Sequence, residues 1–274
     1  KPRFGLDHTL IDGETVAVTE QIVARRGFGQ LKHFARAADR DDPKLLIVAP
    51  MSGHYATLLR GTVEVMLPDH EVFITDWRDA RTAPLFEGHF DLDDYIDYLV
   101  DWLHELGPDT HVLAVCQPSV PVLAAVSMMA ADNDRCAPAS MVLMGGPIDT
   151  RVNPTEINTI AETLSLAWFE RHAIVRVPWP NPGMMRRVYP GFLQLAGFMS
   201  LNMDRHIEAH ADIFRHLVEG DGESAQKKQD FYEEYRAVMD MTAEYYLQTV
   251  KVVFKEHDLP RGRMTSRGRL IEPA

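Results

Sequence analysis

The chain has 274 residues, of which 46% are hydrophobic, so it can bury the core of one large domain or of a domain with an insertion. Its formal net charge of −12 excludes an overall electrostatic match with nucleic acid or with an anionic membrane surface. The two cysteines, Cys116 and Cys136, have no metal-binding spacing and make no disulfide framework, which fits a reducing compartment. We find no run of about 20 apolar residues and therefore expect no membrane span.

The first 36 residues are predicted to be mainly extended. Residues 15–18 form a β-rich run behind the turn signal Asp12-Gly13, and residues 21–23 and 31–34 favour further strand.

From residue 44 to residue 144, buried strands are predicted to alternate with helices. The strands are expected at 44–50, Glu71–Trp77, 111–115 and 141–144, and the helices at 55–67, Leu92–Leu106 and 122–131. Asp91 is the predicted N-cap of the second helix, which Gly107-Pro108 ends. This alternation predicts an α/β fold with a parallel, doubly wound sheet.

Cys116 lies where the third of these strands turns into a helix. The frame Ala114-x-Cys116-x-Pro118 has compact residues two places to either side, as the G-x-S-x-G turn of α/β-hydrolases does. A thiol at a helix N-terminus is also biased toward the thiolate by the helix dipole. The spacing alone leaves two interpretations open, namely a nucleophile and a buried structural cysteine.

Polar or glycine-rich segments follow the carboxyl end of each predicted parallel strand. They are residues 51–54, 76–81 and 145–151, together with Cys116. Because ligands of parallel sheets bind at the carboxyl ends of the strands, we expect these segments to form one active-site rim. Asp76 and Asp79 are expected to orient the loops there, through Arg78 and Arg81.

After residue 148 the pattern changes to a mainly helical insertion, which we expect to form a cap extending to residue 260. One long helix is predicted over 231–254, where apolar residues recur at helical spacing. Four arginines between residues 261 and 269 favour a solvated, flexible end over an anion contact. His206, His210 and His216 are helically spaced but have no matching carboxylate, so a packing or surface role is favoured over metal binding.

Several long segments resemble the intracellular polyhydroxyalkanoate (poly-3-hydroxybutyrate) depolymerase family. They are Val115-Cys116-Gln117-Pro118-Ser119-Val120-Pro121, Ala49-Pro50-Met51-Ser52-Gly53-His54, Thr75-Asp76-Trp77-Arg78-Asp79-Ala80-Arg81, Phe90-Asp91-Leu92-Asp93-Asp94-Tyr95-Ile96, Met144-Gly145-Gly146-Pro147-Ile148-Asp149-Thr150-Arg151 and Tyr189-Pro190-Gly191-Phe192-Leu193-Gln194. The resemblance implies an α/β-hydrolase core over residues 1–147, a mainly helical cap over 148–260, and the start of a return to the core over 261–274.

The resemblance also implies the site residues. Cys116 would be the nucleophile, and the backbone N–H groups of Gln117 and Met51 would hold the oxyanion. The triad Asp and His of this family follow the insertion, in segments that the present sequence does not contain. The resemblance therefore implies a fragment without its C-terminal strands and without an assignable triad acid or base. His54, beside the oxyanion loop, is a weak candidate base. No metal and no cofactor are expected.

The implied function is hydrolysis of stored polyhydroxyalkanoate at the surface of cytoplasmic granules, through a thioester on Cys116. Three alternatives stay open. One is a cysteine acyltransferase of the polyester synthase type, although such enzymes keep glycine on both sides of the cysteine. The second is a granule-binding protein without turnover, since the triad is incomplete. The third is a structural remnant without activity. Cys136, in a turn-like connector, is expected to be structural.

Overall fold

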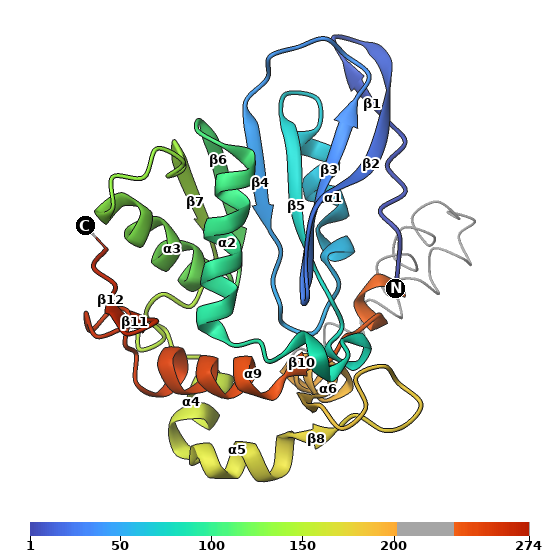
Figure 1. Cartoon of the computed structure of the whole chain (residues 1–274). Coiled ribbons are helices and arrows are strands. Elements are labelled where there is room, and N and C mark those ends of the chain that lie inside the picture. The colour runs from blue at the N-terminus through green and yellow to red at the C-terminus, as the bar shows by residue number, and fades with distance from the viewer. Residues whose placement is uncertain (202–232, 274) are drawn as a thin grey trace.

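A computed structural model describes residues 1–201 and 233–273 (Figure 1). Its centre is a seven-stranded sheet in the order β1-β2-β3-β5-β4-β6-β7. The strands are β1 (His8–Ile11), β2 (Glu14–Arg26), β3 (Gly29–Arg36), β4 (Lys44–Val48), β5 (Glu71–Trp77), β6 (Thr110–Val115) and β7 (Ser140–Met144). The last four are parallel to one another, and β3 joins them antiparallel through β5. The predicted parallel sheet is confirmed.

The sheet buries both of its faces, as the apolar strands predict. In β4, Leu46 and Val48 face one hydrophobic cluster, while Leu45 and Ile47 face the other. Side chains alternate between the two faces of a strand, so a strand that is apolar throughout needs a cover on each side.

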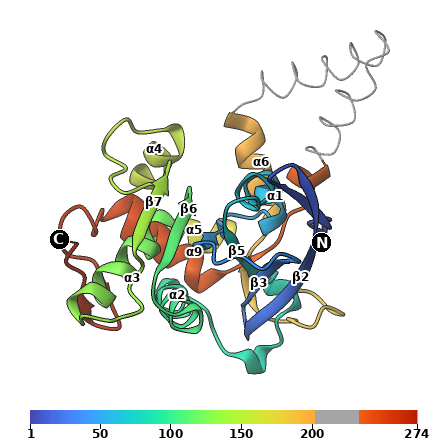
Figure 2. The ribbon, with the colours of Figure 1, turned by 90° about the horizontal axis from the view of Figure 1, so that it is seen from above.

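Helices provide these two covers. Helices α2 (Leu92–Leu106) and α3 (Ser119–Ala131) pack together on one face, and α1 (Arg60–Met66) packs on the other (Figures 1 and 2). Asp91 caps α2 as predicted, in a capping box with Asp94. The helix expected over 55–67 is divided into a 3₁₀ turn, η1 (Ala56–Leu59), and α1.

The N-terminal hairpin turns at Asp12-Gly13, as expected, but its second strand is longer than expected. Asp12 and Gly13 both have positive φ, 52° and 86°, as the tight turns of hairpins require, and they connect β1 to β2. Strand β2 then runs without a break to Arg26, past an irregularity in its register between Ile22 and Ala24.

A second layer lies across the carboxyl ends of the parallel strands (Figure 1). It contains α4 (Glu156–Thr163), α5 (Leu166–Ala173), β8 (Val175–Arg176), β9 (Arg187–Tyr189), α6 (Gly191–Leu201), β10 (Met241–Thr242), α9 (Ala243–Thr249) and the π-helical turn η4 (Val250–Lys255). Strands β10, β9 and β8 form a small antiparallel sheet. The layer is joined to the loop after β5 by Arg81, whose guanidinium donates twice to the carboxylate of Asp240, at 3.0 and 3.1 Å.

Two sequence-based predictions in this region are wrong. A continuous helix over 231–254 is excluded because Val238 forms a β-bridge with His54 and because β10 pairs with β9 before α9 begins. The arginine-rich end is not a free tail, since the short strands β11 (Thr265–Ser266) and β12 (Arg269–Leu270) form a hairpin there. Its arginines have acidic partners that spacing along the sequence cannot reveal: Arg267 pairs with Asp94 and Asp97 of α2, and Arg269 pairs with Asp132 after α3.

His206, His210 and His216 lie outside the described residues. Among the helices that the structure does describe, none is long and apolar enough to cross a membrane.

Candidate active site

Cys116 occupies a strained turn between β6 and α3. Its φ is +69°, a left-handed conformation that residues other than glycine rarely adopt. The turn is closed on both sides, because the Cys116 N–H donates to the Met144 carbonyl at 2.7 Å and the Ser119 N–H donates to the Cys116 carbonyl at 3.1 Å. The side chain is exposed rather than buried. This geometry is that of a nucleophile elbow, and it disfavours the interpretation of Cys116 as a buried structural cysteine.

Gly146 explains how the loop after β7 fits against this turn. A Cβ atom on Gly146 would lie 2.1 Å from the Cβ and Oγ of Ser119 and 2.9 Å from the Cys116 carbonyl oxygen. Both distances are shorter than any non-bonded contact allows. The loop can therefore support the elbow only if residue 146 has no side chain.

The two predicted oxyanion donors come from neighbouring loops. Met51, just after β4, is buried, and its backbone N–H donates to the side-chain Oε1 of Gln117 at 3.4 Å. The Met51 N–H, which we expect to bind the oxyanion, thus already donates a hydrogen bond to an oxygen atom, Gln117 Oε1. The observed contact is consistent with an oxyanion hole at this place, and the catalytic roles of Met51 and Gln117 remain predictions.

Cys116 opens into a cavity of about 590 Å³ between the sheet and the layer that covers its carboxyl ends. Its wall is mainly apolar, with Ile160 and Ala161 of α4, Phe169 of α5, and Val250 and Phe254 of η4. Cavities of this size, largely apolar with a few polar groups, are typical of small-molecule sites. The polar groups of the wall include Gln194, Tyr245 and Thr249, together with Asp149 on the loop after β7.

The ionisable side chains of the cavity are held in defined protonation states. Hydrogen bonds from Arg151 lower the pKa of Asp149 to about 2, so this carboxylate is ionised and paired. Burial raises the pKa of Tyr245 and of Tyr246 well above the usual tyrosine range, so both hydroxyls keep their protons.

No histidine is found among the described residues that line the cavity. His54 is buried, its Nε2 lies 3.0 Å from the Tyr235 carbonyl oxygen, and burial lowers its pKa. His257 is also buried, with Nδ1 at 2.9 Å from the Thr150 hydroxyl oxygen. The geometry of these two residues supports packing roles rather than the role of a base for Cys116.

Asp76, near the end of β5, and Asp79, just after it, make structural hydrogen bonds as expected, but not with the expected arginine side chains. Asp79 accepts hydrogen bonds from the backbone N–H groups of Arg81 and Asp240, at 2.9 and 3.1 Å. Asp76 is buried, and Lys1 and Gln30 donate to its carboxylate. Asp79 thereby links the rim to the overlying layer.

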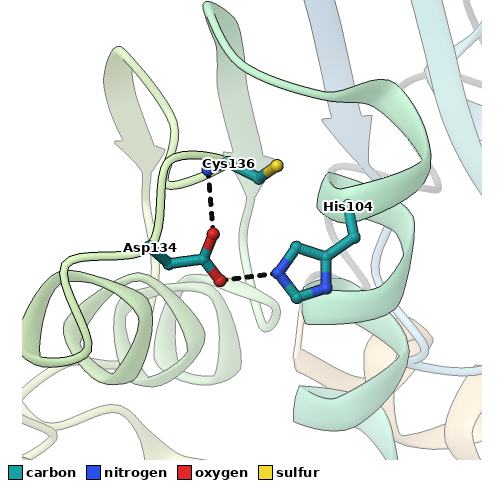
Figure 3. A group of neighbouring side chains, drawn as sticks. All are labelled: His104, Asp134 and Cys136. Carbon is teal, nitrogen blue, oxygen red and sulfur yellow. Dashed lines mark hydrogen bonds and ion pairs between the residues drawn. The ribbon is translucent and has the colours of Figure 1, made fainter.

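A cluster of potential metal ligands, separate from the cavity, lies on the surface between α2 and the loop after α3 (Figure 3). Its ligand atoms, from His104, Asp134 and Cys136, lie within 4.8 Å of one another. Two interactions already hold Asp134, because its carboxylate lies 2.6 Å from His104 Nε2 and accepts the Cys136 N–H at 2.9 Å. Cys136, which the sequence places in a plain connector, is thus half-buried in a polar cluster.

Sequence reasoning missed the polar side of the cavity. Tyr245 and Thr249 lie in a stretch that the helical periodicity assigned mainly to core, and Gln194 was noticed only as part of the family resemblance. A tyrosine and a threonine four places apart were the available signal, because they share one helix face.

Comparison with known proteins gave a family match and several distant structural similarities. Residues 145–274 match the family model described as PHB de-polymerase C-terminus. Similar solved structures include the carboxylesterase CesB of Bacillus subtilis, at 12% identity over 57% of this chain and 53% of that chain, with a TM-score of 0.36. The naproxen esterase of the same organism has 14% identity over 61% and 58%, with a TM-score of 0.35. An esterase of Pyrobaculum calidifontis has 15% identity over 56% and 55%, with a TM-score of 0.36.

The chain thus spans little more than half the length of these solved structures. A comparison with curated proteins gave no match. The strand order, the antiparallel β3 and the elbow at Cys116 identify the fold as that of the α/β-hydrolases. Residues 145–274, a little under half of the chain, are thus similar to the C-terminal part of polyhydroxybutyrate depolymerases.

Proposed function

We propose that the chain is the catalytic part of a carboxylic ester hydrolase that cleaves polyhydroxyalkanoate at granule surfaces in the cytoplasm, with Cys116 as the nucleophile. The observation that carries the proposal is the strained elbow, which presents an exposed cysteine to an apolar cavity. The family match supports the polyester as substrate. An aliphatic polyester fits an apolar cavity, and the net charge of −12 does not favour a polyanionic substrate.

The first half of the proposed reaction forms a thioester. The Cys116 thiolate attacks an ester carbonyl carbon, a C–S bond forms, and the carbonyl electron pair moves onto oxygen. The N–H groups of Met51 and Gln117 hold this oxyanion, and each such donor contributes roughly 3–4 kcal/mol to the transition state. The oxyanion collapses and breaks the C–O bond, and the departing alkoxide takes up a proton to leave as a hydroxyl-terminated chain.

In the second half, water attacks the thioester carbonyl. The C–S bond breaks, a carboxylic acid leaves, and the thiolate is restored. In the part of the chain that the structure describes, no cavity-lining histidine is present to move these protons. Because general-base assistance is typically worth 10²–10⁴-fold, we expect this chain to acylate and deacylate slowly.

The test is to trap the acyl group. The protein is incubated with p-nitrophenyl 3-hydroxybutyrate, the reaction is quenched in acid, and the protein is digested. The mass of the peptide that contains Cys116 is then measured by mass spectrometry. We expect one 3-hydroxybutyryl group on Cys116, none in Cys116→Ala, and unchanged labelling in the matched control Cys136→Ala. Release of 3-hydroxybutyrate from amorphous granules is measured in parallel.

Labelling that survives Cys116→Ala would refute the assignment of the nucleophile. Binding to granules without any acylation would instead support the granule-binding alternative. Transfer of the trapped acyl group to an added alcohol faster than to water would support an acyltransferase.

A further inference from the structure

Three buried polar groups on the wall of the cavity have no hydrogen-bond partner among the described residues. They are Gln194 Nε2, the Tyr245 hydroxyl and Thr249 Oγ1. The Tyr245 hydroxyl has the side chains of Gln117 and Thr249 as neighbours, but none of the three groups is in hydrogen-bond geometry with a protein partner among the described residues. All three residues are more than nine-tenths buried, with exposed fractions of 7%, 1% and 8%. Leaving such a group unpaired is costly, and native proteins rarely do so without a functional reason. Their gathering on a single cavity points to a ligand that supplies the missing partners.

The Tyr245 hydroxyl is held rigidly in its place. The ring stacks on Tyr95, with centroids 5.6 Å apart and planes 14° apart, and it contacts Phe90 at 5.9 Å. Thr249 follows four residues later on the same face of α9, and Gln194 comes from α6. The π-helical turn η4 begins directly after Thr249, and such turns are frequent at functional sites.

The neighbouring Tyr246 offers a matched tyrosine on the same wall. Tyr246 also lines the cavity, but its hydroxyl interacts with that of Tyr189, and the two rings stack at 3.9 Å. Tyr246 is therefore a control for the loss of a tyrosine hydroxyl from this wall.

An amide N–H and two hydroxyls can all donate hydrogen bonds, whereas the interior of a polyester offers acceptors only. We propose that Gln194, Tyr245 and Thr249 form a subsite that binds the carbonyl oxygen of a second ester unit, so that the cavity recognises a segment with two or more ester groups. This inference rests on the proposed function, since the first ester is the one that Cys116 attacks. It makes the three residues determinants of specificity for oligoesters over simple esters.

The experiment compares two activated esters that differ at the second carbonyl alone. One is p-nitrophenyl 3-acetoxybutyrate, and the other is p-nitrophenyl 3-ethoxybutyrate, which lacks that carbonyl oxygen. The measured quantity is the ratio of their rates of Cys116 acylation. We expect the acetoxy ester to react faster and Tyr245→Phe to reduce this ratio by about tenfold, because one hydrogen bond is lost. Tyr246→Phe should leave the ratio unchanged, whatever it does to either rate alone.

Two measurements separate a lost contact from a damaged fold. Methyl methanethiosulfonate reacts with Cys116 without presenting a carbonyl, so its rate should be equal in Tyr245→Phe and in the parent protein. The melting temperature of Tyr245→Phe should be no lower than that of the parent protein, because the substitution removes an unpaired buried hydroxyl. A ratio that Tyr245→Phe does not change would overturn the subsite.

A failure of the proposed function would look different. Cys116 would then react with methyl methanethiosulfonate but with neither ester. In that case calorimetry on Cys116→Ala decides the subsite directly, with methyl 3-acetoxybutyrate and methyl 3-ethoxybutyrate as probes. Tighter binding of the acetoxy compound that is lost in Tyr245→Phe supports the subsite, and equal binding of the two compounds refutes it.

Discussion

Replacing Gly146 by alanine should damage the nucleophile elbow while leaving every reacting group in the chain. The new Cβ would be 2.1 Å from the Cβ and Oγ of Ser119, where carbon atoms normally approach to about 3.5–4.0 Å. An overlap of about 1.5 Å between a loop and the first turn of α3 must move one of them. Overpacking of a well-packed site costs about 1–3 kcal/mol, and we expect Gly146→Ala to fall in the upper part of that range. A displacement near 1 Å at a reacting group costs roughly 100-fold in rate.

The assay combines urea unfolding with the rate of Cys116 acylation by p-nitrophenyl 3-hydroxybutyrate. Gly61→Ala in α1 is the matched control, since its Cβ meets no atom within 4 Å and alanine favours the helix by about 1 kcal/mol. Ser119→Gly removes most of the overlap, so the double variant should recover part of both losses. Gly146→Ala with the stability and the acylation rate of the parent protein would show that the loop does not support the elbow.

Three further predictions follow from other contacts. Arg81→Ala should lower the free energy of unfolding by about 2–3 kcal/mol in urea titrations, because it leaves the buried Asp240 carboxylate without its counter-charge. The loss should be smaller than for a fully buried ion pair, because the Arg81 side chain is 44% exposed. Burial lowers the pKa of His54, so below about pH 6.5 the unfolded state binds more protons than the folded state, and the free energy of unfolding decreases as the pH decreases. His54→Gln should reduce this pH dependence in unfolding measured between about pH 5 and 7, and an unchanged pH dependence would contradict the prediction. Iodoacetamide should alkylate exposed Cys116 faster than half-buried Cys136, and equal rates by peptide mapping would count against an activated elbow.

The core of the fold could be predicted because local pattern and tertiary structure agree there. Strand β5 was predicted at its exact limits, and α2 was predicted together with its Asp91 cap and its end before Gly107. Apolar β-branched runs and caps carry their own signals. The strand order could not be predicted from the residue pattern alone, because the spacing of the strands along the sequence does not reveal that β5 lies between β3 and β4.

Prediction failed where distant residues decide the local structure. The helix expected over 231–254 is interrupted where Val238 forms a β-bridge with His54 and β10 pairs with β9, and Asp240 there pairs with Arg81, more than 150 residues earlier in the chain. In the C-terminal segment, Arg267 pairs in the same way with Asp94 and Asp97 of α2. An ion pair across such a distance leaves no periodic trace in either segment.

For the candidate site, the sequence located Cys116, the proposed nucleophile, but not its surroundings. The elbow is a local motif, so Cys116 could be placed from residues 114 to 118 alone. The subsite proposed around Tyr245 combines residues from α6 and α9, and only the folded chain shows that their polar atoms lack partners.

A strained residue and an unpaired buried hydroxyl face each other across the cavity. Cys116 holds a positive φ that two backbone hydrogen bonds secure, and Gly146 has no side chain that would prevent this arrangement. Across the same cavity, Tyr245 keeps an unpaired hydroxyl on a ring that packing fixes. Cys116 and Tyr245 both line the cavity of about 590 Å³. A ligand that accepts hydrogen bonds at Tyr245 and presents a carbonyl carbon to Cys116 would satisfy both, and an ester chain has these two properties in every repeat.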